Sequence, residues 1–349
     1  MLKKVCVIGH FGFGQTLLNG QTVKTKIITA ELQEQLGNQN VLKIDTCGGG
    51  RNLITLAFKS AIAMITCKNI IIMPANNGLR FFAPLLSYGN KLFKCKLHYI
   101  VVGGWLSDYL SYRKSLRSQL KRFDGIYVET DEMKKALENL GFANVSVMPN
   151  CKKLTIVSKD SLVYPNGEPY KLCTFSRVMK EKGIENAIEA VTKVNMIAGR
   201  IIYTLDIYGE VDTNYYERFE RLKKDFPSYI SYGGLVPFDK STPILKNYFA
   251  LLFPTFYEGE GFAGTIIDAF AAGVPVVATN WKYNTEIIDD KVGYIYSTDR
   301  IEELIKVLVV ASNNPEIFTR LKINCIERAN RYSAKAVVRN FIKYLCVEE

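Results

Sequence analysis

Two carboxylates flank a glycine-rich turn in the C-terminal third of the sequence. Glu260 and Asp268 follow an apolar segment, 250–254, and glycines stand at positions 259, 261 and 264. Free backbone N–H groups and the start of a helix suit a phosphate group. Because carboxylates do not assist the binding of an anion, Glu260 and Asp268 need another partner, and sugar hydroxyls are the natural one. The predicted chemistry of this turn is recognition of a sugar that carries phosphate.

Two cations follow an earlier apolar segment, 170–175. Arg177 comes just past that segment, and Lys182 stands where the next helix is expected to start. The planar fork of an arginine and the point charge of a lysine together suit a diphosphate. A cation at a helix N-terminus opposes the helix dipole, so Lys182 needs a reason to be there. The alternative is a surface ion pair with Glu181 or Glu185.

Helix capping is a competing explanation for Asp268. Thr265 could cap the helix, and Asp268 three residues later would complete an arrangement like a capping box. Capping does not explain Glu258, Glu260 and the glycines in the same turn. So many glycines indicate a backbone that a ligand approaches closely.

Short apolar segments that alternate with helical patterns must position these residues. In the first half, strands are expected at 4–9, 41–46, 69–74, 97–103, 125–129 and 145–149. The helices between them are expected near 22–35, 52–66, 79–88, 107–122 and 132–140. A second series has strands at 170–175, 203–208, 229–235, 250–254, from 275, and 293–296, with helices at 183–196 and 214–226.

This alternation predicts an α/β protein with two Rossmann-like doubly wound domains and a cleft between them. Ligands of such sheets bind at the carboxyl ends of the strands. Residues 1–150 are expected to form the first domain. The polar segment 151–168 reads as a linker, and residues 169–349, terminal helices included, as the second domain.

The composition is that of a soluble globular protein with room for two cores. Hydrophobic residues make up 48% and charged residues 23% of 349 positions. No apolar run reaches the ~20 residues of a membrane-spanning helix. Eight cysteines without CxxC spacing argue against a zinc cage or a disulfide framework and favour a reducing cytosol. The expected location is the cytoplasm.

Positive charge is concentrated in the first half. Residues 1–150 carry 19 Lys and Arg against 9 Asp and Glu, a net charge of +10 out of +11 for the chain. Eight cations in 91–122 face one acid, Asp108, with aromatic residues among them: Lys91, Lys94, Lys96, Arg113, Lys114, Arg117, Lys121 and Arg122. Such a face suits an anionic membrane surface, at ~1 kcal/mol per cation. A solvated helix face and a nucleic-acid-binding face are the alternatives, and we expect no nucleic acid.

The segment from Glu260 to Asp268 resembles the E-x7-E signature of retaining glycosyltransferases of the GT-B fold, family 4, whose bacterial members build cell-surface polysaccharides. Arg177 and Lys182, with four residues between them, are similar to the R-x4-K diphosphate clamp of that family. Further matches are Met148-Pro149-Asn150, Pro254-Thr255 and the run Gly273-Val-Pro-Val-Val. The resemblance is specific across 170–290 and looser over 1–150.

The resemblance implies a nucleotide-diphospho-sugar as donor. Arg177 and Lys182 would hold the diphosphate, Glu260 would contact hydroxyls of the transferred sugar, and Asp268 would accept the ribose hydroxyls. The residues implied in donor binding are Gly20, Gly234, Val236, Gly261, Phe262, Ala263, Gly264, Thr265 and Asp268. The implied reaction is front-face substitution with retention, in which fixed cations stabilise the departing phosphate without a metal or a cofactor.

The sequence departs from the family pattern at several positions. Asp268 replaces the usual second glutamate, Ala263 stands where glycine is common, and Cys151 replaces a linker glycine. Many relatives have an acceptor-side histidine at the end of a strand. Here His98 falls within a strand and is expected in the core, whereas His10 follows the first strand and is the acceptor-side candidate. Asp108 is a weaker one.

No Asp-x-Asp metal motif occurs, and the nearest match, Glu129-Thr130-Asp131, reads better as a helix cap. The expected function is transfer of a sugar to a glycan or lipid-linked acceptor, by a cytoplasmic protein that can lie peripherally on the inner face of the cell membrane. A nucleotide-sugar epimerase or a phosphorylase on the same fold would share the site. A non-enzymatic polyanion binder would use only the basic first half and would not need the clustered loop chemistry.

Overall fold

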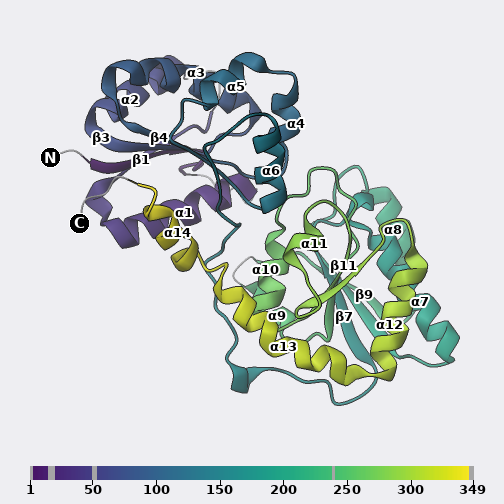
Figure 1. Ribbon diagram of the computed structural model, residues 1–349. Coiled ribbons are helices and arrows are strands. Elements are labelled where there is room, and N and C mark those ends of the chain that lie inside the picture. The colour runs from purple at the N-terminus through teal and green to yellow at the C-terminus, as the bar shows by residue number, and fades with distance from the viewer. Residues whose placement is uncertain (1–2, 15–19, 49–52, 238–239, 346–349) are drawn as a thin grey trace. The chain divides into compact units, whose positions relative to one another are not determined.

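The computed structural model describes residues 3–14, 20–48, 53–237 and 240–345 (Figure 1). The chain divides into two compact units. The first unit consists of 1–153 together with 332–349, and the second consists of 154–331.

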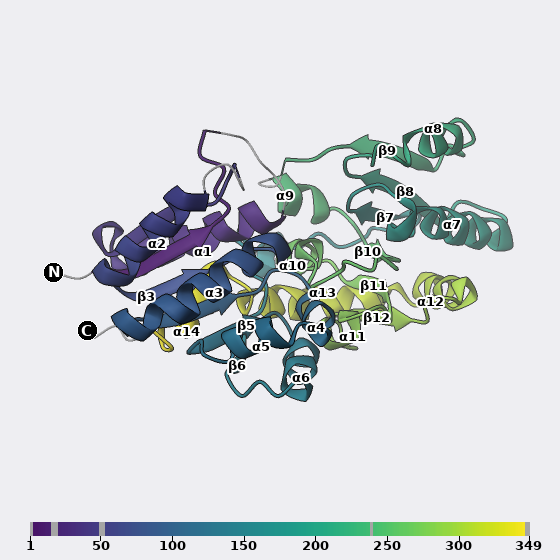
Figure 2. The ribbon, with the colours of Figure 1, turned by 90° about the horizontal axis from the view of Figure 1, so that it is seen from above.

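The described part of the first unit forms a parallel six-stranded sheet of order β2-β1-β3-β4-β5-β6. Its strands are β1 (Lys3–Gly9), β2 (Val41–Asp45), β3 (Cys67–Ile72), β4 (Lys96–Ile100), β5 (Gly125–Val128) and β6 (Val145–Val147). Its helices are α1 (Gly20–Leu36), α2 (Leu53–Thr66), α3 (Asn76–Phe93), α4 (Leu106–Ser111), α5 (Lys114–Leu120), α6 (Asp131–Asn139) and α14 (Ala334–Ile342). Figure 2 shows α2 and α3 side by side, and the two helices are in contact.

The described part of the second unit repeats this plan with the order β12-β11-β10-β7-β8-β9. Its strands are β7 (Tyr170–Phe175), β8 (Tyr203–Tyr208), β9 (Ile230–Gly234), β10 (Ala250–Phe253), β11 (Val276–Thr279) and β12 (Gly293–Tyr296). Its helices are α7 (Ile184–Ala198), α8 (Tyr216–Lys224), α9 (Ser241–Leu245), α10 (Gly264–Ala271), α11 (Asn284–Ile287), α12 (Ile301–Asn313) and α13 (Pro315–Asn330). A short 3-10 turn, η4 (Lys180–Lys182), precedes α7.

Strand order sets the place of a ligand site in each unit. In the first sheet β1 lies between β2 and β3, and in the second β7 lies between β8 and β10. All pairs are parallel; for example, Val5 pairs with Asn69 and Leu251 with Cys173. The chain therefore reverses its winding direction between β1 and β3 and again between β7 and β10. Crevices at the carboxyl ends of such strand pairs are the usual ligand sites of doubly wound sheets.

The central strands form because their apolar runs can be covered on both faces. Val5, Val7 and Ile8 of β1 are fully buried, as are Leu172 and Cys173 of β7. These observations confirm the predicted fold class of two Rossmann-like doubly wound domains. One expected helix is divided: 107–122 forms α4 and α5, which are separated at Tyr112 and Arg113.

The end of the chain belongs to the first unit, although the sequence placed it with the second. Helix α14 buries Ala334, Val338 and Phe341 in the core that contains Val5 of β1. The Phe341 ring lies edge-on to Tyr127, at 4.8 Å between centroids. In Figure 1, α14 lies beside α1, and the two are in contact. An amphipathic pattern predicts that a helix will be buried on one face, but it does not say which sheet the helix covers.

Candidate active site

A buried ion pair lies at the carboxyl ends of β7 and β10. Lys182 Nζ is 2.5 Å from Glu260 Oε2, and the two side chains are 12% and 8% exposed. The Thr255 hydroxyl donates a hydrogen bond to the same carboxylate oxygen at 2.8 Å. Lys182 Nζ also lies over the Tyr257 ring, 5.1 Å from its centroid. Each charge of the pair is thus matched by several partners, as burial requires.

Backbone contacts lock the two loops that carry this pair. Gly183, between η4 and α7, has a φ of 69°, and a Cβ built on it would lie 2.0 Å from the carbonyl oxygen of Pro254. The Phe256 N–H donates to the Glu181 carbonyl at 2.7 Å. Only glycine allows this approach at a positive φ. The glycine therefore sets the position of Lys182 against the end of β10.

Arg177 lies outside the Lys182–Glu260 pair. Its Nη1 is 3.7 Å from Asp212 Oδ2, and its side chain is 59% exposed. The backbone before it is held tightly, because a Cβ on Gly209 would lie 1.8 Å from the Ser176 carbonyl oxygen. The two predicted clamp cations thus have different environments. Lys182 is buried in an ion pair, and Arg177 is exposed beside a carboxylate.

The glycine-rich turn leads into α10, whose N-cap is Ala263. The Thr265 Oγ1 is buried and has no hydrogen-bond partner among the described residues. The capping explanation for Thr265 is therefore wrong. Asp268 lies in α10 and is 5% exposed, and Phe262 before the helix is also buried. Gly261, Ala263 and Gly264 are partly exposed at the start of α10.

The end of β9 joins the same edge of the sheet. Gly234 has a φ of 76°, and its carbonyl accepts a hydrogen bond from the Gly209 N–H at 2.9 Å. Since Gly209 also packs against Ser176, the loops after β7, β8 and β9 are connected through backbone contacts. Val236, two residues on, is partly exposed.

In the first unit, a cavity of about 550 Å³ lies beside the carboxyl ends of β1 and β3. His10 lines it, and the His10 Nδ1 is 2.7 Å from the Thr22 hydroxyl of α1. Leu53 and Leu56 of α2 also line the cavity. Gly20 is the first residue of α1 and is exposed, and positions 15–19 before it lie outside the described residues. No group of three or more His, Cys, Asp or Glu that could hold a metal ion occurs in the described segments.

Comparison with known proteins identifies part of the second unit. Residues 169–314 match the family model for glycosyl transferases group 1. Residues 169–314 are therefore similar to glycosyl transferases group 1. This matched segment contains Arg177, Lys182, Glu260 and Asp268, so the ion pair and the glycine-rich turn both lie inside it.

Two curated proteins are similar over about half of the chain. An uncharacterized glycosyltransferase of Methanocaldococcus jannaschii is 30% identical over 181 residues, which cover 50% of this chain and 40% of that protein. The GtfA subunit of the UDP-N-acetylglucosamine–peptide N-acetylglucosaminyltransferase of Streptococcus gordonii is 28% identical over 207 residues, 57% of this chain and 40% of that protein. The matched part thus spans well under two thirds of either relative.

A solved structure extends the similarity of fold to nearly the whole chain. HepE of Anabaena, crystallised with UDP, has a TM-score of 0.74 and 13% identity, and the alignment covers 98% of this chain and 99% of that one. At this identity the comparison concerns the fold, which is the GT-B fold of two Rossmann-like domains.

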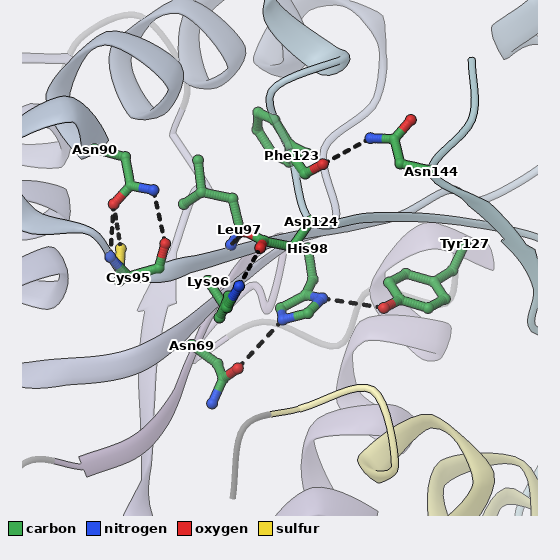
Figure 3. Close-up of polar contacts among 10 residues, drawn as sticks. All are labelled: Asn69, Asn90, Cys95, Lys96, Leu97, His98, Phe123, Asp124, Tyr127 and Asn144. Atoms are coloured by element: carbon green, nitrogen blue, oxygen red, sulfur yellow. Dashed lines mark hydrogen bonds and ion pairs between the residues drawn. The ribbon is translucent and has the colours of Figure 1, made fainter.

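Outside the matched segment, His98 is a core residue, as predicted. Its side chain is buried, with Nδ1 3.1 Å from the Tyr127 hydroxyl and Nε2 3.2 Å from Asn69 Oδ1 (Figure 3). Burial lowers the pKa of His98 to about 4. The imidazole is therefore neutral near pH 7 and links β3, β4 and β5. Asp108, the weaker acceptor-side candidate, lies exposed in α4.

The motif Glu129-Thr130-Asp131 contains the predicted cap and an ion pair that the sequence did not reveal. The Thr130 hydroxyl accepts a hydrogen bond from the Met133 N–H at 3.2 Å, which confirms it as the cap of α6. Glu129 pairs with Lys24 of α1 at 2.5 Å, and both side chains are buried. Lys24 and Glu129 are far apart in sequence, and only the rotation of α1 about its axis brings them together.

Asp45, at the end of β2, is a second residue that sequence reasoning missed. Its carboxylate accepts hydrogen bonds from the N–H groups of Phe11, Phe13 and Cys47 at 2.9 Å each. Burial alone would raise the pKa of Asp45, but these backbone donors bring it below its usual value. The carboxylate thus fixes the loop that follows His10. An acidic residue at a strand end, opposite a glycine-bearing loop, was the available signal.

Proposed function

We propose that the protein transfers a sugar from a nucleotide-diphospho-sugar to a glycan or lipid-linked acceptor, with retention and without a metal, in the synthesis of a cell-surface polysaccharide. The observation that carries the proposal is the Lys182–Glu260 pair at the winding reversal of the second unit. It provides a cation for a phosphate and a carboxylate for sugar hydroxyls within one hydrogen bond of each other.

The proposed roles follow from the setting of each side chain. Arg177, exposed beside Asp212, is available to a diphosphate that arrives from solvent. Lys182 is held in place and needs little reorganisation when charge develops on the departing phosphate. Glu260 keeps its Thr255 hydrogen bond while it accepts from a sugar hydroxyl. The remaining proposed donor contacts are Gly20, Gly234, Val236, Gly261, Phe262, Ala263, Gly264, Thr265 and Asp268.

Names of similar proteins suggest which donors to test first. GtfA of Streptococcus gordonii is named for UDP-N-acetylglucosamine, and HepE was crystallised with UDP. We therefore propose a UDP-sugar as the donor class. For the acceptor we propose the cavity beside His10, in which this imidazole is already oriented by Thr22.

A thermal-shift screen of nucleotide-diphospho-sugars tests donor binding, because a ligand that binds only the folded state raises its stability. The true donor should raise the melting temperature of the wild type and fail to do so in Lys182→Ala. Transfer by Arg177→Ala and Lys182→Ala should fall by about a hundredfold or more, if a lost cation costs ~2.7–4 kcal/mol as lost oxyanion donors do. Lys193→Ala, which removes an exposed cation of α7 paired with Glu189, is the matched control.

Full turnover in both cation variants would refute the assigned roles. Product analysis separates the other reactions that this fold supports. Interconversion of the sugar nucleotide without an acceptor would indicate an epimerase, and dependence on inorganic phosphate would indicate a phosphorylase. The anomeric configuration of the product tests retention directly.

We also propose that the protein works on the cytoplasmic face of a membrane. No helix in the described ranges is long and apolar enough to cross a bilayer. The basic residues of 91–122 are distributed over the end of α3, the start of β4, and α5 with the residues that flank it, whereas α4 has none. Lys91 and Arg122 meet there, because both cations lie over the Tyr88 ring, at 5.6 and 5.1 Å from its centroid.

A further inference from the structure

One face of α2 is apolar and exposed to solvent. Ile54 is 88% exposed, Phe58 67%, Ile62 41% and Ile65 57%. Their spacing of four, four and three residues places them along a single side of the helix. The opposite side, with Leu56 and Met64, is buried in the unit. Contiguous exposed apolar surface of this kind marks an interaction site rather than an ordinary solvent-facing helix.

The C-terminal end of α3 extends this apolar face. Gly89 lets α3 approach α2 closely, since a Cβ there would lie 2.9 Å from Met64 Cε. Leu92 and Phe93, one turn further along α3, are 81% and 37% exposed. Residues three and four apart share a helix side, so Leu92 and Phe93 continue the surface on the side of α3 that meets α2.

The charges on α2 and α3 have one sign. Between Asp45 and Asp108 the sequence has no acidic residue and seven Lys and Arg. Lys59 is exposed beside Phe58 on α2, and Lys91 and Arg122 gather around Tyr88 of α3. An apolar helix face with cations beside it, on helices that carry no carboxylate, is typical of a helix that lies in the interface of an anionic bilayer.

The first turn of α2 also lines the cavity beside His10. Leu53 and Leu56 line it together with Phe81 and Phe82 of α3. Ile54, between those two leucines in sequence, belongs to the exposed face. A membrane that covers this face would therefore lie next to a cavity with apolar walls.

We propose that the first unit docks on an anionic membrane through the apolar face defined by Ile54, Phe58, Ile62 and Ile65 of α2 with Leu92 and Phe93 of α3. The cations of α3 and α5 then contact lipid headgroups at its border. The docked helix brings the cavity beside His10 to the membrane surface, where a lipid-linked acceptor can enter it. This last step rests on the proposed function, whereas the docking does not.

Flotation of the full chain with lipid vesicles tests the docking. The wild type should bind vesicles of equal parts phosphatidylcholine and phosphatidylglycerol at least about tenfold more tightly than vesicles of phosphatidylcholine alone. Ile54→Ser, Phe58→Ser and Ile65→Ser combined should weaken binding to the mixed vesicles at least about tenfold. The matched control is Met196→Ser with Ile197→Ser, which removes two side chains of α7 that are 73% and 71% exposed.

Lys59→Glu separates the contribution of charge to vesicle binding from that of the apolar side chains. It should weaken binding to mixed vesicles and leave the smaller affinity for phosphatidylcholine unchanged. Wild-type protein that binds neither kind of vesicle overturns the proposal, as does equal binding by the combined variant. So does a concentration-dependent dimer that the combined variant abolishes in the absence of vesicle binding.

A donor-induced thermal shift measured on the same variants keeps the two proposals distinguishable. The combined variant should keep the wild-type shift, because all of its changes lie in the first unit and none in the matched segment 169–314. A wild type that binds vesicles but no nucleotide sugar would refute the proposed function and leave the docking intact.

Discussion

Among the described residues, each unit has one lysine–glutamate pair that is largely buried, and the two pairs differ in what surrounds them. Lys24 and Glu129 of the first unit are 4% and 3% exposed, and Lys24 also donates to the Val101 carbonyl at 3.4 Å. Lys182 and Glu260 of the second unit are more open and are flanked by glycine-rich loops. Both pairs have N–O distances of 2.5 Å.

This contrast suggests that surroundings, rather than pairing, distinguish a structural ion pair from one that serves a ligand. Lys24 lies inside α1, and its partner directly follows β5, so the pair ties a helix to the sheet. Lys182 and Glu260 both lie in loops at the winding reversal, where doubly wound sheets bind ligands. The first pair should therefore act on stability and the second on activity.

The largest expected effect is on the stability of the first unit. Lys24→Met removes the cation that pairs with the buried Glu129 carboxylate and should lower the free energy of unfolding by about 3–5 kcal/mol. Urea unfolding can be followed for this unit alone, because the chain has two tryptophans, Trp105 in the first unit and Trp281 in the second. A Trp281→Phe background leaves Trp105 as the probe.

The double variant Lys24→Met with Glu129→Leu is the control for this experiment. It removes both charges and should recover most of the lost stability, since apolar replacements of a buried pair are often neutral. A double variant as unstable as the single one would mean that packing around Lys24, rather than the buried charge, is responsible.

The second pair should behave in the opposite way. Glu260→Gln keeps an oxygen for the Thr255 hydroxyl but loses the charge proposed to bind sugar hydroxyls. Loss of a hydrogen bond to a charged group costs about 1.5–3 kcal/mol, so kcat/KM for transfer should fall roughly ten- to a hundredfold. Glu129→Gln should lower stability and leave transfer at 25 °C unchanged. Equal effects of the two substitutions on transfer would contradict the distinction.

The strands and the edges of the sheets were predictable, because short apolar runs between helical patterns fit few structures other than buried strands. Once β7 and β10 are neighbours, the loops after them must converge, so the meeting of Lys182 with Glu260 follows from topology. The partnership of Lys24 with Glu129 does not, since it depends on the rotation of α1 about its axis. No charge motif or spacing in the sequence marks that rotation.

Other differences between the prediction and the structure also arise from contacts between segments that are distant in sequence, or from helix ends that carry no local signal. Helix α14 has a clear apolar face, but its covering of the first sheet is decided by the path of the whole chain. The separation of α4 from α5 at Tyr112 and Arg113 has neither proline nor glycine to signal it. Thr265 had the right type and place for a cap, yet the helix starts one residue before it, at Gly264. Local patterns predict elements better than they predict which surfaces meet.

His98 should make the stability of the first unit depend on pH. Its pKa is about 4 in the folded state against an ordinary value of 6.5, because burial disfavours the charged imidazole. The unfolded chain therefore binds a proton that the folded chain does not between those values. The associated stability is fully present above pH 6.5 and is lost as the pH falls toward 4.

At pH 5.5 this loss should reach about 1.2 kcal/mol relative to pH 7. His98→Gln lacks the titrating group, so its unfolding free energy should fall less between pH 7 and pH 5.5, by about that amount. Unfolding followed through Trp105 measures both proteins. Parallel pH profiles of wild type and variant would show that His98 does not contribute, and His10, present in both, cancels from the difference.

The smallest expected effect concerns the exposed end of the proposed clamp. Arg177 must exchange Asp212 for a diphosphate if it holds the donor. Asp212→Asn removes the competing charge. An exposed ion pair is worth about 0.2–1 kcal/mol, so donor affinity should rise by at most about fivefold, and stability should fall by no more than the same free energy.

Glu168→Gln is the matched control for Asp212→Asn, because it releases Arg200, which is 63% exposed and paired at 2.9 Å. Glu168 lies at the other end of β7, away from the loops proposed to bind the donor, so donor affinity should stay at the wild-type value. Calorimetric titration with a UDP-sugar measures both variants. If Asp212→Asn weakens donor binding, Asp212 orients Arg177 rather than competing for it, and the exposed pair would then resemble the buried one in being part of the site.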